Sequence, residues 1–338
     1  MEKKRKSWID IARGIGILLV VLGHVTKNED TVKLIYSFHM PLFFFLSGYL
    51  FDRNQYDIRT FVTRKAKNLL IPYLFFYLLT LTLYYLVEVR VQSGDPFTWR
   101  LLIPLVWGSN VNGLMAHNIV LWFLPALFST EVLFRILSEW FRPVWLPLVV
   151  GLCAAAGLLC YAVRLQGLPM GVNVALIALV FYATGNLLKK HIDAFSCRKV
   201  LLPTLFVGCT AVLFVALMCG GLERVDMASG RYGNFALFVL WAMTGIGMVA
   251  SLSLLIDKSA GLEYVGHSDT SLVIMCFHGM ILRAVLFVTV RLTGLEMAWV
   301  RNNVEISLAV TLITVLICLP LAGICKYVKE NLCGIIRK

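Results

Sequence analysis

Residues 8–26 read WIDIARGIGILLVVLGHVT, an apolar run with only three ionisable side chains, those of Asp10, Arg13 and His24. A helix that crosses a bilayer needs about 20 mostly apolar residues, and this run has that length. Similar runs recur along the 338-residue chain, which is 59% hydrophobic and only 15% charged. Soluble domains carry about 25% charged residues. The composition therefore excludes a soluble globular enzyme or a disordered protein and indicates an integral membrane protein.

The apolar runs predict an all-α bundle of about ten transmembrane helices, in one membrane domain over residues 1–338 with no appended soluble domain. The predicted spans are 8–26, 34–52, 68–90, 119–137, 144–163, 173–189, 200–219, 234–256, 270–291 and 305–328. The apolar stretch 101–108 is too short to span and is interpreted as interfacial or re-entrant.

The basic residues predict the orientation of the chain. Its net charge is +12, from 31 Lys and Arg against 19 Asp and Glu. With the N-terminus inside and the spans alternating, 20 basic residues fall on the inner side, 9 on the outer side, and Arg13 and Arg283 within helices. Cytoplasmic loops carry the excess of Lys and Arg. We therefore expect a multi-pass protein of the cell inner membrane with both termini cytoplasmic, and no nucleic-acid partner.

The ionisable residues of run 8–26 are candidates for chemistry, because charges inside a membrane are costly and mark functional paths. Arg13 and His24 are 11 residues apart. That spacing places them on one helix face, about 16 Å apart along the axis. Asp10 lies one turn from Arg13 and can pair with it. Two plainer interpretations stay open: Arg13 extends to the lipid headgroups, and His24 is an interfacial histidine.

The second run contains a further histidine beside a proline. In YSFHMPLFFFLSGYLF, His39 precedes Pro41, which is typical of a helix break or kink. A short loop joins the first two runs, so His24 and His39 are both expected in the outer half of the bundle. They can share a polar cavity there, or His39 can be a structural residue that bonds to the backbone.

These motifs together resemble the membrane acyltransferase 3 family. The run WIDIARGIGILLVVLGHV has that family's Arg-x10-His pattern. The following SFHMPLFFFLSGYLF looks like the family's second helix, particularly in the branch of fucose 4-O-acetylases and surface-glycan O-acetyltransferases. RKAKNLLIPY resembles the basic motif before the third helix, WFLPALFSTE a fourth-helix pattern, and GHSDTSLVIMCFHGMI the ninth helix. The matching motifs extend from residue 7 to about residue 283.

The resemblance implies transfer of an acyl group from cytoplasmic acetyl-CoA to a hydroxyl of a cell-surface glycan or lipid-linked sugar. It also implies that Arg13 and His24 form the core of the active site, with Asp10 beside them. A base must take the proton of the sugar hydroxyl, and histidine has a suitable pKa. His24 is therefore the predicted general base, or it takes up the acyl group transiently. Because no Gly-x-Ser-x-Gly elbow is present, direct transfer is favoured over an acyl-serine intermediate.

The basic motif is expected to hold the phosphates of the acyl donor. The family often has Arg-x-x-Arg, and the matching positions here are Arg64 and Lys67. A lysine binds phosphate as a point charge, without the fork of a guanidinium. The residues assigned to the donor are Arg64, Lys65 and Lys67. Marking the inner side of the membrane is the plainer role for the same residues. No metal is expected, because the nine cysteines show no C-x-x-C or mixed Cys/His spacing.

The acceptor is expected to bind where polar side chains meet aromatic walls, because a sugar offers both hydroxyls and apolar C–H faces. The residues assigned to it are His39, Trp122, Glu131 and His278. Alternatively each histidine bonds to a neighbouring backbone group. Glu131 is in addition a buried carboxylate that could fix the tautomer of a histidine.

Two other classes of protein compete with an acyltransferase. A transporter or exporter of a glycan or sugar precursor also has about ten spans, buried charges and a kinked helix. No inverted repeat is visible in the sequence, which disfavours it. The other class is a membrane anchor that positions a partner protein. The partners expected for the favoured interpretation are the lipid bilayer, acetyl-CoA and the glycan or lipid-linked sugar, and a homodimer is left open.

Overall fold

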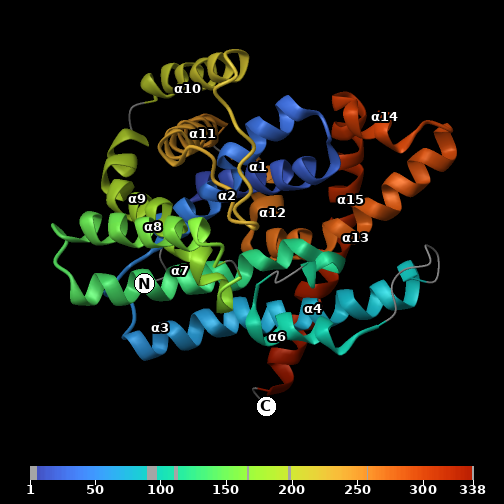
Figure 1. Ribbon diagram of the computed structural model, residues 1–338, viewed down its shortest axis with the longest axis horizontal. Coiled ribbons are helices and arrows are strands. Elements are labelled where there is room, and N and C mark those ends of the chain that lie inside the picture. The colour runs from blue at the N-terminus through green and yellow to red at the C-terminus, as the bar shows by residue number, and fades with distance from the viewer. Residues whose placement is uncertain are drawn as a thin grey trace. The chain divides into compact units, whose positions relative to one another are not determined.

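The computed structural model describes residues 6–89, 97–109, 113–165, 167–196, 199–256 and 258–336. Within these ranges the chain is helical and forms no strand beyond one bridge between Asp226 and Arg231 (Figure 1). Seven basic residues of the orientation count lie outside the described residues: Lys3, Lys4, Arg5, Arg90, Arg198, Arg337 and Lys338.

The helices follow one another along the whole described chain. In order they are α1 Ser7–Val25, α2 Glu29–Leu50, α3 Ile58–Lys65, η1 Ala66–Leu70, α4 Ile71–Leu83, η2 Tyr84–Glu88, η3 Trp99–Leu102, α6 Ile103–Trp107, η5 Ala116–Trp122, α7 Phe123–Trp140, α8 Leu146–Ala162, η6 Pro169–Gly171, α9 Val172–Ser196, α10 Leu201–Met218, α11 Phe235–Ile256, α12 Ala260–Gly266, α13 Ser268–Thr293, α14 Met297–Asn302 and α15 Val304–Ile336.

Eight helices among the described residues are long and apolar enough to cross a membrane. They are Ser7–Val25, Ile58–Leu86, His117–Trp140, Pro169–Phe195, Leu201–Met218, Phe235–Ile256, Ser268–Thr293 and Val304–Tyr327. Two more predicted spans correspond to α2, which is 22 residues long with acidic residues in its first turn, and to α8, an apolar helix of 17 residues. The all-α, multi-pass membrane fold is thereby confirmed.

The third span begins at Ile58 rather than at residue 68. The Asp57 side chain accepts a hydrogen bond from the Thr60 N–H over 3.1 Å, which caps the start of α3. Hydrogen bonding from the Thr60 side chain, and then from its backbone N–H, lowers the pKa of the exposed Asp57 carboxyl. The helix continues through η1, a π-helical segment, into α4. Hydropathy placed the start too late, because the first turns of this helix are polar.

The chain forms two compact units. Unit 1 comprises Met1–Leu42, Ala194–Val225 and Gly233–Lys338, and unit 2 comprises Phe43–Asp193 and Asp226–Tyr232. Helix α2 contributes residues to both and runs unbroken through Pro41, so of the break or kink expected at that proline, the break is wrong.

Helix α1 is the centre of unit 1, where it packs against α11, α12, α13 and α15. Its crossing with α12 is very close: a Cβ on Gly266 would lie 1.7 Å from the carbonyl oxygen of Asp10, and one on Gly14 would lie 2.4 Å from that of Leu262. Small residues let helix backbones approach in this way in membrane proteins. The crossing therefore sets the position of α1 at the level of its Asp10 turn.

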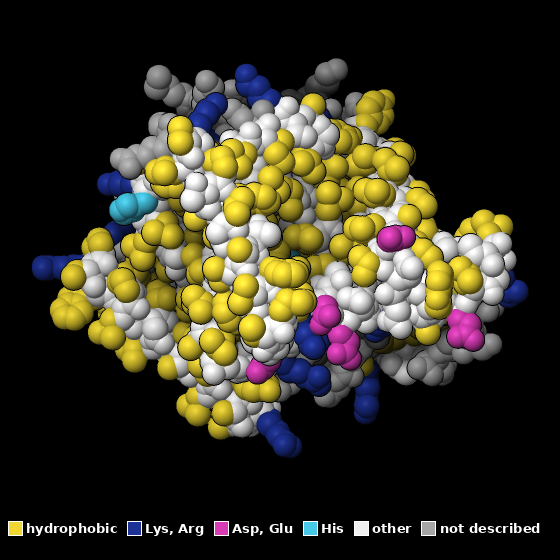
Figure 2. Space-filling view, turned by 90° about the horizontal axis from the view of Figure 1, so that it is seen from above, with side chains coloured by type: hydrophobic (Ala, Val, Ile, Leu, Met, Phe, Trp, Pro, Cys, Tyr) yellow, Lys and Arg dark blue, Asp and Glu magenta, His cyan; other side chains and the backbone are white. Residues whose placement is uncertain are grey.

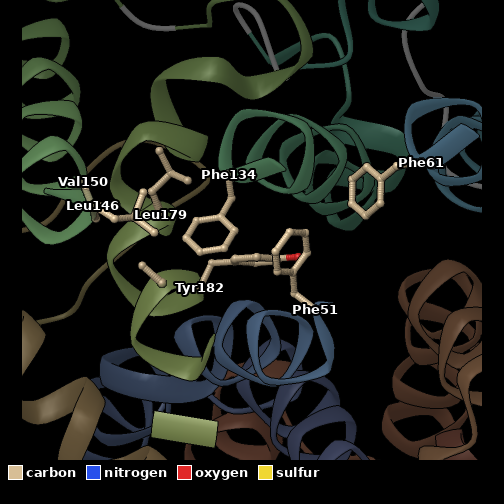
Figure 3. Close-up of a cluster of buried hydrophobic side chains, with 8 residues drawn as sticks. Phe51, Phe61, Phe134, Leu146, Val150, Leu179 and Tyr182 are labelled. Atoms are coloured by element: carbon tan, nitrogen blue, oxygen red, sulfur yellow. The ribbon is translucent and has the colours of Figure 1, made fainter. Parts of the chain in front are cut away.

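Unit 2 has an aromatic core drawn from the end of α2 and from α3, α7, α8 and α9. Figure 3 shows the rings of Phe51, Phe134 and Tyr182 next to one another. The ring centroids are 5.1 Å apart between Phe51 and Phe134 and 4.9 Å apart between Phe134 and Tyr182. A Cβ on Gly48 would lie 1.9 Å from the Tyr182 carbonyl oxygen, so α2 and α9 also cross closely.

The outer surface of the helices is apolar. Figure 2 shows hydrophobic side chains over most of the face that it presents. Large apolar side chains such as Leu152 and Leu159 on α8 and Val207 and Phe214 on α10 are exposed. Soluble monomers rarely expose continuous apolar patches of more than a few hundred Å². Contact with lipid tails accounts for this surface.

Candidate active site

Arg13 and Asp10 form an ion pair inside unit 1, as predicted from their spacing. Arg13 Nη1 lies 3.1 Å from Asp10 Oδ1 and 3.2 Å from the carbonyl oxygen of Gly266 in α12. The two side chains are only 19% and 8% exposed. A buried ion pair is tolerated when further hydrogen bonds offset the lost hydration, and the Gly266 carbonyl provides one. The guanidinium is thus held between two helices.

The two histidines of α1 and α13 lie against each other. The ring centroids of His24 and His278 are 5.3 Å apart, at an interplanar angle of 46°. His278 is fully buried, whereas His24 is partly exposed. His278 Nδ1 lies 3.0 Å from the Ile274 carbonyl oxygen and 2.9 Å from that of Met275. Because carbonyls only accept, Nδ1 carries the proton and Nε2 is left as an acceptor in the neutral ring.

His278 Nε2 has no hydrogen-bond partner among the described residues. A buried acceptor of this kind is unusual, since most buried polar atoms are hydrogen-bonded. It lies on the ring that contacts His24. The Nε2 acceptor of His278 therefore belongs to a ring in contact with the partly exposed imidazole of His24. Two imidazoles in contact are suited to general acid–base chemistry.

His39 lies in the unit 1 part of α2, next to Tyr36. Its Nδ1 is 2.8 Å from the Ile35 carbonyl oxygen, and its ring centroid is 4.9 Å from that of Tyr36. A Cβ on Gly23 would lie 3.1 Å from Tyr36 Cε2. Tyr36 thus packs on α1 one residue before His24 and contacts His39 with its ring.

Arg301 holds the end of α1, which the sequence analysis missed. Its Nε donates to the Val25 carbonyl and its Nη2 to the His24 carbonyl, each over 2.8 Å. Its own carbonyl accepts from the Lys27 N–H over 2.7 Å. The last carbonyls of a helix lack partners within the helix, and a cation there also suits the helix dipole. The sequence shows that such a partner is needed but does not say which of the outer basic residues supplies it.

In unit 2, Lys65 pairs with Glu131, although we assigned these residues to the donor and the acceptor respectively. Lys65 Nζ lies 2.7 Å from Glu131 Oε1, and the Glu131 side chain is only 3% exposed. Glu131 Oε2 has no hydrogen-bond partner among the residues that the structure describes. Of the three basic residues assigned to the donor, Arg64 and Lys67 are exposed. Those two are therefore the ones available to an anionic ligand.

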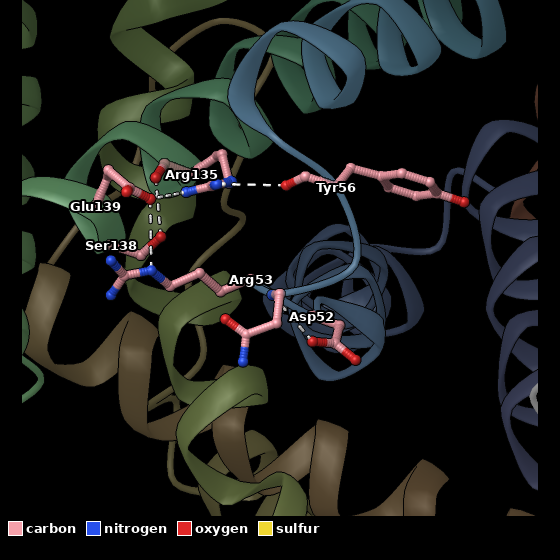
Figure 4. A network of polar contacts seen from close by, with 7 residues as sticks. Asp52, Arg53, Tyr56, Arg135, Ser138 and Glu139 are labelled. Atoms are coloured by element: carbon pink, nitrogen blue, oxygen red, sulfur yellow. Dashed lines mark hydrogen bonds and ion pairs between the residues drawn. The ribbon is translucent and has the colours of Figure 1, made fainter.

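The Arg64 guanidinium lies over the ring of Tyr56, whose backbone belongs to a network of polar contacts. The guanidinium carbon is 4.6 Å from the centroid of the Tyr56 ring. The Tyr56 carbonyl accepts from Arg135 Nη2 over 3.4 Å. Figure 4 shows that Arg135 also pairs with Glu139, which in turn meets Arg53 at 3.5 Å. The network joins the turn before α3 to α7, and it escaped the sequence analysis because its members lie in different elements.

Trp122 ends the 3₁₀-helix η5 in unit 2 and is partly exposed. Its ring centroid is 6.1 Å from that of Phe123. Of the residues assigned to the acceptor, His39 and His278 belong to unit 1, and Trp122 and Glu131 belong to unit 2. Their joint role stays a prediction.

Comparison with known proteins identifies the family. A family model described as "Acyltransferase domain" matches residues 6–323. The nodulation protein NolL of Mesorhizobium japonicum is 30% identical over 151 residues, which cover 40% of this chain and 37% of that protein. The NolL of Sinorhizobium fredii is 42% identical over 86 residues, which cover 21% of this chain and 23% of that protein.

The matched segment is thus well under half of the length of either curated relative. No solved structure matches the chain. The family model, by contrast, covers nearly the whole chain, and the fold has the apolar helices that a membrane enzyme requires. The chain therefore belongs to the acyltransferase 3 family, and its apolar helices are those of a multi-pass membrane protein.

Proposed function

We propose that this acyltransferase moves an acetyl group from cytoplasmic acetyl-CoA to a hydroxyl of a cell-surface glycan or lipid-linked sugar, like the fucose 4-O-acetylase branch that its motifs resemble. The observation that carries the proposal is the contact between the rings of His24 and His278. The Arg13–Asp10 ion pair lies on the same helix as His24. In this proposal residues 1–338 act as one membrane domain of the inner membrane, with both termini cytoplasmic.

The reaction needs one base and one leaving thiol. His24 takes the proton of the acceptor hydroxyl as its oxygen attacks the thioester carbonyl carbon. The C–S bond breaks, and the thiolate of CoA receives the proton from His24, so that free CoA and an acetyl ester are formed. His278 contacts the His24 ring and positions it for this transfer. A base of this kind contributes about 10²–10⁴-fold to the rate.

The donor is proposed to bind on the inner side through Arg64 and Lys67. Both side chains are exposed, and the Arg64 guanidinium makes a cation–π contact with the Tyr56 ring. Arginine and lysine bind phosphates through charge-assisted hydrogen bonds. Lys65 contributes to this region chiefly through its ion pair with Glu131. His39, which touches Tyr36 beside α1, is proposed to line the acceptor site.

A transfer assay with purified protein tests this function. The protein in lipid nanodiscs is given acetyl-CoA with a radiolabelled acetyl group and glycan acceptors, and the labelled product is counted. We expect labelled acceptor from the native protein and background counts from His24→Ala. The matched control is His191→Ala, which removes an exposed histidine of α9.

The competing transporter function makes the opposite prediction when the same purified protein is reconstituted in sealed vesicles. If acceptor crosses the membrane of sealed vesicles while no acetyl group is transferred, the acetyltransferase proposal is wrong. Comparison of the O-acetyl content of surface glycans in cells with and without the protein gives the same decision in vivo.

A further inference from the structure

Three basic side chains gather at the end of α1 that carries His24. Arg301 of α14 binds the carbonyls of His24 and Val25, and its own carbonyl accepts from the Lys27 N–H. Arg224, from the segment between α10 and α11, lies with its guanidinium carbon 5.1 Å from the centroid of the Tyr36 ring. Tyr36 in turn packs on Gly23 of α1. All of these residues belong to unit 1.

Lys27, Arg224 and Arg301 form a basic cluster that no carboxylate of the described residues pairs with. None of the three forms an ion pair within the described residues, whereas Arg13, Lys33, Arg53, Lys65 and Arg135 do. The positive charge of Arg301, partial burial, and the charge of Arg224 together lower the pKa of Lys27. Such a shift is the mark of like charges held close together.

The position of the cluster needs an explanation other than topology. In the proposed orientation its three members are among the few basic residues on the outer side, where a membrane protein normally carries fewer of them. Arg301 has a structural task at the end of α1, yet its Nη1 makes no hydrogen bond among the described residues. Lys27 and Arg224 are exposed, and within the described part of the chain their side chains make no hydrogen bond or ion pair; Arg224 contacts the Tyr36 ring.

Building on the proposed function, we infer that Lys27, Arg224 and Arg301 bind a phosphate group of the acceptor, the diphosphate that joins a sugar to its lipid carrier. Two guanidinium groups and an ammonium suit phosphate oxygens, which guanidinium binds through paired hydrogen bonds. A diphosphate brings more negative charge to the three cations than a single sugar carboxylate would. It would be anchored beside His24, because Arg301 is bonded to the His24 carbonyl itself.

Tyr36 fits the same ligand. Its ring lies between Arg224, His39 and α1, and is partly exposed. An aromatic face next to polar groups suits the apolar face of a sugar. In this arrangement a sugar attached to the bound diphosphate lies on the Tyr36 ring, and one of its hydroxyls comes near His24 and His278.

The decisive variants are Arg224→Gln and Lys27→Gln, which leave the Arg301 bonds to α1 intact. Nanodiscs of neutral phosphatidylcholine are supplied with acetyl-CoA and one of two acceptors, the same sugar on the same lipid through either a diphosphate or an uncharged ether. Loss of one charge-assisted bond should raise KM for the diphosphate acceptor roughly 10–100-fold. KM for acetyl-CoA should stay unchanged. The rate of transfer to the ether acceptor, which is lower than that to the diphosphate acceptor in the native protein, should also stay unchanged.

The matched control is Arg291→Gln, an exposed outer arginine at the end of α13 that lies over the Phe287 ring. It should behave as the native protein. Equal losses with both acceptors, or a raised KM for acetyl-CoA, would overturn the acceptor-phosphate site. A second set of nanodiscs containing phosphatidylglycerol tests a lipid headgroup as the source of the phosphate. If added phosphatidylglycerol changes native activity with both acceptors and Arg224→Gln abolishes that response, the cluster binds phospholipid instead.

A binding measurement separates this site from the proposed reaction. Inorganic pyrophosphate is titrated into the protein without acetyl-CoA, and the dissociation constants of native protein and Arg224→Gln are compared. Weaker binding by the variant, together with no acetyl transfer to any acceptor by native protein, would uphold the phosphate site and reject the acetyltransferase. Equal binding by both proteins would reject the phosphate site, whatever the enzyme activity.

Discussion

The rings of His24 and His278 are 5.3 Å apart, although one lies on the first helix of unit 1 and the other on α13. His278 is held by two carbonyls of its own helix, so its Nε2 is the acceptor on the buried side of the pair. His24 is the partly exposed member. This arrangement supports the proposed roles, in which His24 contacts the substrates and His278 positions it.

His24→Ala should lower acetyl transfer by about 10²–10⁴-fold, the usual effect of removing a general base. The protein should still insert and give a single monodisperse peak in detergent, because the His24 carbonyl that Arg301 binds remains in place. Labelled product per mole of folded protein is the measurement. A variant with near-native turnover would show that another group takes the proton.

His278→Asn should lower kcat while KM for acetyl-CoA stays the same. The amide nitrogen can replace Nδ1 as a donor to the Ile274 carbonyl, whereas Nε2 and the ring contact with His24 are lost. Steady-state kinetics of the purified variant provide the test. If the loss appears only in the yield of folded protein and not in kcat, His278 is a packing residue.

Arg64→Ala and Lys65→Ala should affect different properties of the protein: the first its KM for acetyl-CoA, the second its stability. Arg64 is exposed, so its removal should raise KM for acetyl-CoA without loss of thermal stability. Removal of Lys65 leaves the buried Glu131 carboxylate without its ion-pair partner and should cost about 1–3 kcal/mol of stability. Glu131→Gln should restore part of that loss in the double variant. Identical effects of the two alanine variants on donor KM would contradict this division.

Gly266→Ala should prevent α1 and α12 from packing, because the new Cβ would lie 1.7 Å from the Asp10 carbonyl oxygen. We expect little folded protein in the membrane and no acetyl transfer. Gly261→Ala is the matched control in the same helix, since nothing lies within 4 Å of its Cβ. Fluorescence-detected size exclusion compares the two variants. Similar yields for both would mean that the crossing tolerates a side chain.

Cysteine labelling checks the orientation. Single cysteines introduced at exposed positions within 113–118 and 224–231, such as 113 and 231, should react with an impermeant reagent added to the outside of intact cells, as the count of basic residues predicts. Residues 110–112 of the first loop lie outside the described residues. A cysteine in the turn before α3, at Asn54, should react only after the cells are opened. The reverse labelling pattern would show that the predicted orientation in the membrane is wrong.

The sequence predicts those features that depend on near neighbours or on composition. Apolar runs gave the all-α membrane fold, and the spacing of Asp10 and Arg13 gave their ion pair. The start of α3 at Ile58 was missed, because a polar first turn does not register in hydropathy and only its Asp57 cap signals a helix. A helix periodicity cannot reveal a contact between distant helices.

For the same reason the surroundings of the candidate site were only partly predicted. His24 and His278 were each named, but their contact depends on how α1 packs on α13. Glu131 was named as a carboxylate that could fix the tautomer of a histidine, and it forms an ion pair with Lys65 of another helix. Arg301 was counted only as an outer charge. Nothing local distinguishes it from the other outer arginines.

The hydrogen bond between Arg301 and the His24 carbonyl joins positions 277 residues apart in the chain. A ribosome that adds about 5–20 residues per second needs roughly 14–55 s to cover that distance. Helix α1 therefore enters the membrane long before α12 and α14, which hold its two ends, have been translated. During this interval the last carbonyls of α1 lack the Arg301 guanidinium, and a polypeptide that stalls before residue 301 never acquires it.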